Sequence, residues 1–315
     1  MRYIDEAAID GALDPVFMAD ALRDAFAGDI VVPVRHHHDI HRPEGEATLL
    51  LMPAWTGASQ TEAFVGTKIV SVYPMNGARN LPAVMGTYLL MDGTTGAPLV
   101  ALDGARLTTW RTAAASALAA RYLARKDAAT LTMIGAGAMS PFLIRAHCAA
   151  RPITQVLLWN HNPARARDLA AKLTEEGLPV AAVDDREDAI RKADIVSAAT
   201  LTNTPLIEGA WLKAGAHVDG VGAFKPSMRE TDDAVVQRAT LFCDTKAGAL
   251  KEGGDLFQPI RDCVIKAEDV QADLFDLARG VHPGRTRDDE ITFFKSVGTA
   301  IEDLAAAIAV WKRVR

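Results

Sequence analysis

Apolar and polar positions between residues 130 and 145 change from the pattern of a strand to that of a helix. Thr130 to Ile134 are β-branched or apolar, which predicts a buried strand. The next residues open an apolar helical pattern and include Gly135 and Gly137. Such a turn brings the backbone close to a pyrophosphate and points helix amides at it. It predicts a dinucleotide site, although Ser140 stands where glycine or alanine is usual; glycines that only allow close packing are the alternative.

The hydrophobic runs that follow alternate between strand and helix patterns. They predict strands at 155–160, 180–183, 195–200, 217–222 and 240–244, with helices at 164–176 and 188–192. Strands that alternate with helices indicate a parallel, doubly wound sheet. The expected fold class is therefore α/β, with a Rossmann-type NAD(P)-binding domain over residues 120–293.

The first hundred residues carry a different pattern. A helix is predicted over 14–27, an extended segment at 31–34, strands at 47–55 and 63–74, and a hairpin within 82–103. A polar cluster runs from Arg35 to His41 and contains three consecutive histidines. Adjacent strand residues point to opposite faces, so the cluster favours a substrate-site or edge-strand role over a metal site.

One lysine interrupts an apolar row of the strand predicted at 63–74. Lys68 shares a face with Phe64, Gly66, Val70 and Val72 because strand side chains alternate with period two. A buried charge without a partner is costly, so this ammonium must meet a carboxylate, a ligand or solvent. A lysine whose ammonium reaches solvent at a sheet edge is the alternative.

An arginine lies on the apolar stripe of the alanine-rich helix predicted at 107–124. Arg111 shares that stripe with Leu107, Ala114, Ala115 and Leu118, so its face should be buried. A guanidinium at the start of a packed helix suits a carboxylate ligand, which it binds through two parallel hydrogen bonds. An internal salt bridge is the alternative.

The end of the second predicted strand bears on coenzyme preference. NAD sites usually place an acidic residue there, about 20 residues after the glycines, to bind the ribose hydroxyls. This chain has Asn160, His161 and Asn162, followed by Arg165. Neutral donors and an arginine favour the extra phosphate of NADP(H), with NAD(H) also possible; Arg165 as an ordinary solvated helix residue is the alternative.

The C-terminal segment predicts a turn at residues 295–298 that leads into a final amphipathic helix. This turn would offer a helix N-terminus to the coenzyme, or Gly298 would only let the chain cross back to the first domain. The predicted coenzyme-binding residues are Gly135, Ala136, Gly137, Ala138, Met139, Asn160, His161, Asn162, Arg165, Thr200, Val221, Gly222, Lys295, Ser296 and Gly298.

Composition narrows the class of protein. The formal net charge of −6, without a basic run, argues against nucleic acid or anionic membrane as a partner. Cys148, Cys243 and Cys263 are odd in number and lack a C-x-x-C spacing, which is typical of small buried hydrophobes in a reduced compartment. No apolar run approaches the ~20 residues that span a bilayer, and no secretory leader is evident. A cytoplasmic protein is expected.

Five segments, in this order, resemble the ornithine cyclodeaminase and mu-crystallin family. They are VGTKIVSVYP (65–74), LPAVMGTYLLMDGTTGAPL (81–99), LTTWRTAAASALAA (107–120), IGAGA (134–138) and EITFFKSVGTAIEDL (290–304). The resemblance implies a discontinuous α+β domain of residues 1–119 with 294–315, which binds substrate and carries a homodimer interface. It also implies active sites in the cleft between this domain and the Rossmann domain.

The same resemblance implies hydride transfer between a nicotinamide ring and a carbon that bears nitrogen and carboxylate. Lys68 matches the family's active-site lysine, and Arg111 and Arg35 match its substrate-carboxylate arginines. Cyclodeaminases have a catalytic aspartate where this chain has Phe224. The segment GAFKPSMRE (222–230) instead resembles the ketimine reductases, which act on pyrroline-2-carboxylate or piperideine-2-carboxylate.

The predicted activity is therefore NAD(P)H-dependent reduction of a cyclic imino acid to proline or pipecolate. Arg111 and Arg35 would hold the carboxylate, and Lys68 would protonate or orient the imine nitrogen. Ornithine cyclodeaminase, alanine dehydrogenase and a non-catalytic NADPH-binding protein like mu-crystallin are the alternatives.

Overall fold

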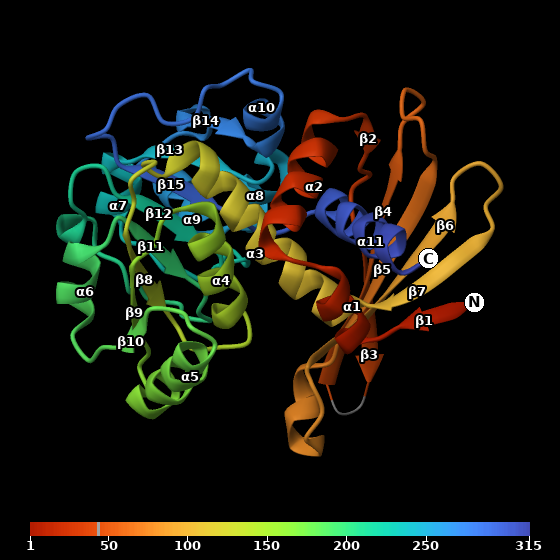
Figure 1. Cartoon of the computed structure of the whole chain (residues 1–315), viewed down its shortest axis with the longest axis horizontal. Coiled ribbons are helices and arrows are strands. Elements are labelled where there is room, and N and C mark those ends of the chain that lie inside the picture. The colour runs from red at the N-terminus through yellow and green to blue at the C-terminus, as the bar shows by residue number, and fades with distance from the viewer. Residues whose placement is uncertain (43–44) are drawn as a thin grey trace. The chain divides into compact units, whose positions relative to one another are not determined.

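The chain forms two compact units in the computed structural model, which describes residues 1–42 and 45–315 (Figure 1). The first unit comprises Met1–Thr112 with Thr299–Arg315, and the second comprises Ala113–Gly298. The second unit thus begins at residue 113 where 120 was expected, and ends at 298 where 293 was expected. The later end has a clear cause, because residues 292–295 form a strand of the second unit's own sheet.

The first unit contains a seven-stranded sheet in the order β1-β7-β6-β5-β4-β2, with β3 also paired to β4. All its pairs are antiparallel except the parallel pair of β1 and β7. The elements are β1 (Arg2–Ile4), α1 (Glu6–Ala12), α2 (Pro15–Ala27), β2 (Ile30–Val31), β3 (His36–Arg42), β4 (Gly45–Thr56), β5 (Phe64–Val72), the 3-10 helix η1 (Pro74–Arg79), β6 (Val84–Asp92), β7 (Pro98–Asp103), the start of α3 (Gly104–Leu123) and α11 (Ala300–Val314).

Local chemistry explains why the predicted helix and hairpin form here. Asp14 caps α2 by accepting a hydrogen bond from the amide of Phe17, directly before Pro15. The β6–β7 turn is closed by Asp92, which accepts hydrogen bonds from the amides of Thr94 and Thr95. The histidine cluster forms β3, which pairs only with β4 among the described residues, so the expected edge strand is confirmed.

Helices bury one face of this sheet. Helix α11 packs against β4, β5 and β6 and against α2, as Figure 1 shows. The row Met52, Lys68, Tyr88 and Leu102 crosses the sheet from β4 to β7 and is buried throughout. Lys68 therefore lies in the middle of the sheet. The alternative of a lysine at a sheet edge is wrong.

The second unit is a doubly wound α/β domain. Its eight strands are all parallel, in the order β10-β9-β8-β11-β12-β15-β13-β14, which confirms the expected fold class. The strands are β8 (Thr130–Ile134), β9 (Gln155–Trp159), β10 (Val180–Ala182), β11 (Ile195–Ala198), β12 (His217–Gly220), β13 (Thr240–Cys243), β14 (Val270–Asp273) and β15 (Thr292–Lys295). The helices are α4 (Ser140–Ala150), α5 (Pro163–Glu175), α6 (Arg186–Lys192), α7 (Asp233–Arg238), α8 (Lys246–Glu252), α9 (Gly254–Arg261), α10 (Leu274–Ala278), η2 (Gly209–Trp211) and η3 (Ala267–Asp269).

Strand β15 corrects the predicted turn at 295–298. Lys295 is the last residue of β15, which lies between β12 and β13 and pairs Lys295 with Gly220. All four residues of β15 are buried, because a parallel strand between two others is covered on both faces. Because its apolar run is only four residues long, the sequence pattern alone does not distinguish this strand from a turn that precedes a helix.

The cysteines and helices test two simpler expectations. Cys243 is buried and Cys148 half-buried, whereas Cys263 is exposed with a φ of 59° after α9, so the expectation of a buried thiol is wrong there. None of the described helices combines the length and the apolar character needed to cross a bilayer.

Candidate active site and coenzyme site

A buried ion pair joins β5 to α11 in the first unit. The ammonium of Lys68 lies 2.9 Å from Oδ1 and 2.8 Å from Oδ2 of Asp303, and it also donates to the Thr108 hydroxyl at 3.3 Å. Lys68 is 3% exposed and Asp303 is fully buried. The carboxylate partner that the lysine required is therefore a residue of the C-terminal helix.

Arg111 joins the same group from α3. Its Nε donates to Asp303 at 3.0 Å and its Nη1 to Glu302 at 2.6 Å. Arg111 is 6% exposed, as its position on the apolar stripe predicted. The internal salt bridge considered as an alternative is present, and it places Arg111 and Lys68 on one shared carboxylate.

The electrostatics of this group tune the lysine. Burial lowers the pKa of Lys68, Asp303 opposes this effect, and the charge of Arg111 adds to it, so that the resulting pKa is about 8. Burial alone would raise the pKa of Asp303, but the two cations outweigh it and lower that pKa. The result is a lysine that changes protonation near neutral pH beside a carboxylate that stays ionised.

Arg35 lies next to the same sheet. It directly precedes β3, whose first pair joins His36 to Leu51, and the next position of β4, Met52, pairs with Lys68. Strand β4 lies between β3 and β5, so positions that face each other across it on β3 and β5 are separated by two strand spacings, roughly 10 Å. The sheet thus brings the Arg35 backbone close to the row that carries Lys68, and the Arg35 side chain is partly exposed.

The glycine turn between β8 and α4 has the geometry that a dinucleotide requires. Gly135 has a φ of 110°, a conformation that favours glycine, and a Cβ at Gly137 would meet no atom within 4 Å. Within residues 1–42 and 45–315, the amides of Ala138 and Met139 donate no hydrogen bond. Open space and amides at the N-terminus of α4 fit a bound pyrophosphate.

The contacts of Ser140 explain why a serine stands where glycine or alanine is usual in this turn. Its hydroxyl donates to the Gly135 carbonyl at 2.8 Å and accepts from the Gly137 amide at 3.2 Å. The side chain is fully buried and ties the turn to the start of α4. The serine therefore stabilises the turn from within.

The predicted phosphate-binding residues after β9 have separate roles. Asn160 accepts a hydrogen bond from the Ala136 amide at 3.2 Å and donates to the Asn162 carbonyl, so its side chain holds the turn. Asn162 caps α5. The side chains of His161 and Arg165 are exposed, so these two of the predicted residues remain candidates for contact with a ligand.

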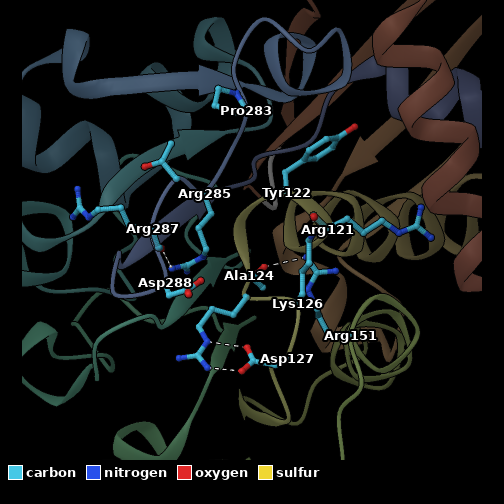
Figure 2. Close-up of a pocket in the computed structure, with 12 residues that line it drawn as sticks. Arg121, Tyr122, Ala124, Lys126, Asp127, Arg151, Pro283, Arg285, Arg287 and Asp288 are labelled. Carbon is cyan, nitrogen blue, oxygen red and sulfur yellow. Dashed lines mark hydrogen bonds and ion pairs between the residues drawn. The ribbon is translucent and has the colours of Figure 1, made fainter.

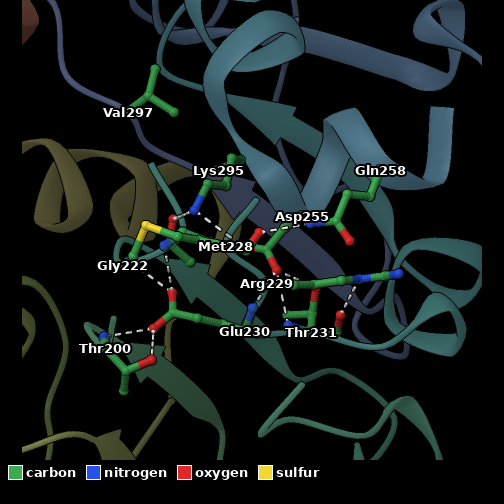
Figure 3. A network of polar contacts seen from close by, with 12 residues as sticks. Thr200, Gly222, Met228, Arg229, Glu230, Thr231, Asp255, Gln258, Lys295 and Val297 are labelled. Atoms are coloured by element: carbon green, nitrogen blue, oxygen red, sulfur yellow. Dashed lines mark hydrogen bonds and ion pairs between the residues drawn. The ribbon is translucent and has the colours of Figure 1, made fainter. Parts of the chain in front are cut away.

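A polar network closes the carboxyl ends of β11, β12 and β15, as Figure 3 shows. Glu230 accepts hydrogen bonds from the amides of Thr200 and Gly222, and Lys295 donates to Asp255 at 3.1 Å and to the Gly220 carbonyl at 3.0 Å. The Val221 amide donates to the Ala198 carbonyl. Lys295 is fully buried, and its ammonium is paired within this network.

The amides of residues 296–298 are also used inside the second unit. Ser296 donates to the Gly220 carbonyl, and Val297 and Gly298 both donate to Asp244 at 2.7 Å. All three amides are therefore paired within the second unit. Gly298 has a φ of 81° and ends the unit, which fits the alternative of a glycine that redirects the chain.

An arginine-rich cavity of about 800 Å³ lies elsewhere in this unit (Figure 2). It is formed by the end of α3 and the loop before β15. Arg151 donates to the carbonyls of Arg121 and Ala124, and Arg285 donates to that of Leu123. These guanidinium groups satisfy the C-terminal carbonyls of α3, so the cluster stabilises a helix end.

Sequence reasoning missed the four carboxylates that organise both sites. Asp303, Glu302, Glu230 and Asp255 are all fully buried. In the final helix a signal was available, because Glu302 and Asp303 interrupt an otherwise apolar run. Two buried carboxylates imply two buried cations, and Lys68 and Arg111 were already identified.

The parallel sheet, the glycine turn and the open α4 N-terminus define a Rossmann-type dinucleotide-binding protein. The chain belongs to the ornithine cyclodeaminase/mu-crystallin family, whose model matches residues 6–315.

Three relatives illustrate the range of that family. A Delta(1)-pyrroline-2-carboxylate reductase of Paracoccus denitrificans is 40% identical over 89% of this chain and 90% of its own. The Thermococcus litoralis enzyme of the same name, solved with NADH and L-proline, has a TM-score of 0.91 and 33% identity, covering 99% of this chain and 97% of its own. An archaeal alanine dehydrogenase dimer with bound NAD has a TM-score of 0.90 and 27% identity, covering 99% and 95%.

Proposed function

We propose that the protein is an NAD(P)H-dependent reductase of cyclic imino acids, which converts pyrroline-2-carboxylate or piperideine-2-carboxylate to proline or pipecolate. The observation that carries the proposal is the buried group in which Lys68 and Arg111 share Asp303. The relatives named as pyrroline-2-carboxylate reductases over nearly the full chain support the same reaction.

Each cation of this group has a task that its chemistry suits. Arg111, with Arg35, binds the substrate carboxylate and fixes the imine carbon in a reactive position. Lys68 protonates or orients the imine nitrogen, because its pKa of about 8 keeps a transferable proton near neutral pH. Asp303 holds the ammonium in place. A bound reduced nicotinamide supplies the hydride.

The coenzyme rests on the glycine turn and on the end of β9. The residues from Gly135 to Met139 hold the pyrophosphate, and the backbone near Thr200, Val221 and Gly222 borders the nicotinamide half. NADPH is favoured over NADH because exposed His161 and Arg165 follow β9 in place of an acidic residue. The solved relatives named above carry NADH or NAD, so both coenzymes belong in the test.

The sheet of the first unit supports a homodimer. Trp55, Ile69 and Met85 lie on the face opposite Lys68 and are 36%, 40% and 39% exposed. Apolar side chains on one sheet face fit a second copy of the chain. Light scattering should give a dimer mass for the wild type and a monomer for Ile69→Asp; a wild-type monomer would overturn this assembly.

The exposed Phe224 favours a reductase over ornithine cyclodeaminase. It lies in the loop after β12 and is 40% exposed, where the cyclodeaminases have a catalytic aspartate. Asp219 offers no substitute, because it is fully buried and accepts hydrogen bonds from Ser116 and Ser197. Without a carboxylate at position 224, loss of ammonia lacks the base that the cyclodeaminases have there.

A coenzyme-oxidation assay tests the proposal. Loss of NADPH or NADH absorbance should follow addition of pyrroline-2-carboxylate or piperideine-2-carboxylate. Ornithine with NAD, and pyruvate with ammonia and NADH, test the cyclodeaminase and alanine dehydrogenase alternatives. Coenzyme binding without turnover of any of these compounds would indicate a ligand-binding role like that of mu-crystallin and would overturn the proposal.

A further inference from the structure

Glu230 connects two loops at the carboxyl end of the eight-stranded sheet. Its Oε1 accepts hydrogen bonds from the Thr200 amide at 2.6 Å and the Thr200 hydroxyl at 2.7 Å. Its Oε2 accepts from the amides of Gly222 at 2.7 Å and Ala223 at 3.2 Å. One fully buried carboxylate thus fixes the second residue after β11 and the second residue after β12 (Figure 3).

Glu230 is itself held by a second buried carboxylate. Asp255, at the start of α9, accepts hydrogen bonds from the amides of Glu230 at 2.8 Å and Thr231 at 2.9 Å. The ammonium of Lys295 pairs with the other oxygen of Asp255 at 3.1 Å. The Glu230 backbone is therefore anchored to α9 and β15 before its side chain reaches the two loops.

The loop that Glu230 fixes is packed against the coenzyme turn. A Cβ at Gly135 would lie 3.1 Å from the Ala199 carbonyl oxygen and 3.2 Å from Cγ2 of Thr200. A Cβ at Gly222 would lie 2.1 Å from the Thr200 carbonyl oxygen. Both glycines are in close contact with residues 199–200, so a shift of this loop would displace the turn between β8 and α4.

We propose that Glu230 is a positioning residue for the coenzyme: it holds Thr200 and Gly222 so that the glycine turn keeps the geometry that binds a dinucleotide. The role rests on the proposed function, because the bound molecule is a nicotinamide dinucleotide. Glu230 acts through the backbone of other residues and does not itself contact the reacting atoms.

The test compares two buried glutamates of the same domain. Glu230→Gln keeps the side-chain shape but turns one acceptor into an amide donor that faces amide or hydroxyl donors. Glu290→Gln is the matched control: Glu290 is 7% exposed and accepts from the Thr286 amide at 2.8 Å and the Thr240 hydroxyl at 2.6 Å. Thr240 begins β13 and Thr286 precedes β15, so both threonines lie at the amino ends of these strands.

We expect Glu230→Gln to raise the Kd of NADPH and NADH about tenfold, the equivalent of one hydrogen bond to a charged group. Kd is measured by nicotinamide fluorescence without substrate, at a temperature where both variants are folded. Glu290→Gln should lower the unfolding temperature but leave both Kd values unchanged. Amide exchange at Thr200 and Gly222 should rise in Glu230→Gln alone.

Three outcomes would overturn the inference. They are equal Kd values for Glu230→Gln and wild type, equal weakening in both glutamate variants, and unchanged amide exchange. If Glu230→Gln does not fold, Thr200→Val removes only the hydroxyl donor, and a Kd equal to that of the wild type would count against the role. A wild type that binds coenzyme but reduces no imino acid would reject the proposed function alone, because the Kd comparison needs no substrate.

Discussion

Two buried lysines of this protein, Lys68 and Lys295, are paired with aspartates in different surroundings. In the first unit, Asp303 has two cationic partners, Lys68 and Arg111. In the second unit, Asp255 has one cation, Lys295, and its other oxygen is filled by the amides of Glu230 and Thr231. Backbone donors cannot leave their partners without local unfolding, whereas side-chain cations can exchange partners.

This difference distinguishes the group proposed to take part in the reaction from the group that stabilises the fold. In the proposed mechanism, the cations of the Lys68 group change partners when a substrate carboxylate or imine nitrogen binds. The Lys295 group holds loops, because each carboxylate in it joins segments that are distant in sequence. A buried charge is therefore a site candidate only when its partners are themselves side chains able to rearrange.

The largest expected effect comes from replacing each lysine by methionine. Lys68→Met should reduce kcat by about 10²–10⁴-fold because it removes the proposed proton donor. It should leave coenzyme affinity intact, since Asp303 keeps Arg111 as a partner. Lys295→Met should instead destabilise the fold by about 3–5 kcal/mol, because it leaves Asp255 without its cation.

Steady-state kinetics and urea unfolding on both variants check this contrast. A Lys68→Met enzyme with normal turnover would remove the lysine from the mechanism. A Lys295→Met protein of unchanged stability would show that the amides alone satisfy Asp255, and that the two groups differ less than their geometry indicates.

Arg111→Lys should give the next largest effect. Lysine keeps the positive charge beside Glu302 and Asp303, so the buried carboxylates keep a cation, but the planar pair of donors is lost. We expect the substrate KM to rise about tenfold or more with a smaller change in kcat. A change in kcat alone, at constant KM, would place Arg111 outside substrate binding.

Asp303→Asn should move the pH dependence. Lys68 must be protonated to act as an acid, so kcat/KM of the wild type should fall as the pH rises through about 8. Asp303 raises the pKa of Lys68, so its neutralisation should shift this limb to lower pH by about one unit. A limb that stays in place would show that another group titrates.

Local pattern was sufficient to predict much of this molecule. The strands from β8 to β13 and the buried row of Lys68 follow from hydrophobic patterns within short windows, and the glycine turn follows from two glycines between a strand pattern and a helix pattern. Arg111 was placed on a buried stripe in the same way.

The partners of these residues depend on contacts that no local pattern contains. Asp303 is 235 residues from Lys68 in sequence, and only the packing of α11 on the sheet joins them. Lys295 was assigned to a turn because a four-residue strand followed by glycine resembles a loop. Its pairing with β12 and β13 depends on the order of strands, which is a property of the whole sheet.

Arg165→Ala should give the smallest effect and tests the coenzyme side of the second unit. The side chain is exposed near the start of α5, so its contribution to a phosphate is screened by solvent. We expect the ratio of kcat/KM for NADPH to that for NADH to fall by about threefold to tenfold, mainly through the KM for NADPH. Arg167→Ala is the control, because Arg167 is exposed on the same helix and pairs with Asp184. Equal ratios in wild type and Arg165→Ala would leave His161 as the remaining candidate for phosphate recognition and would weaken the preference for NADPH.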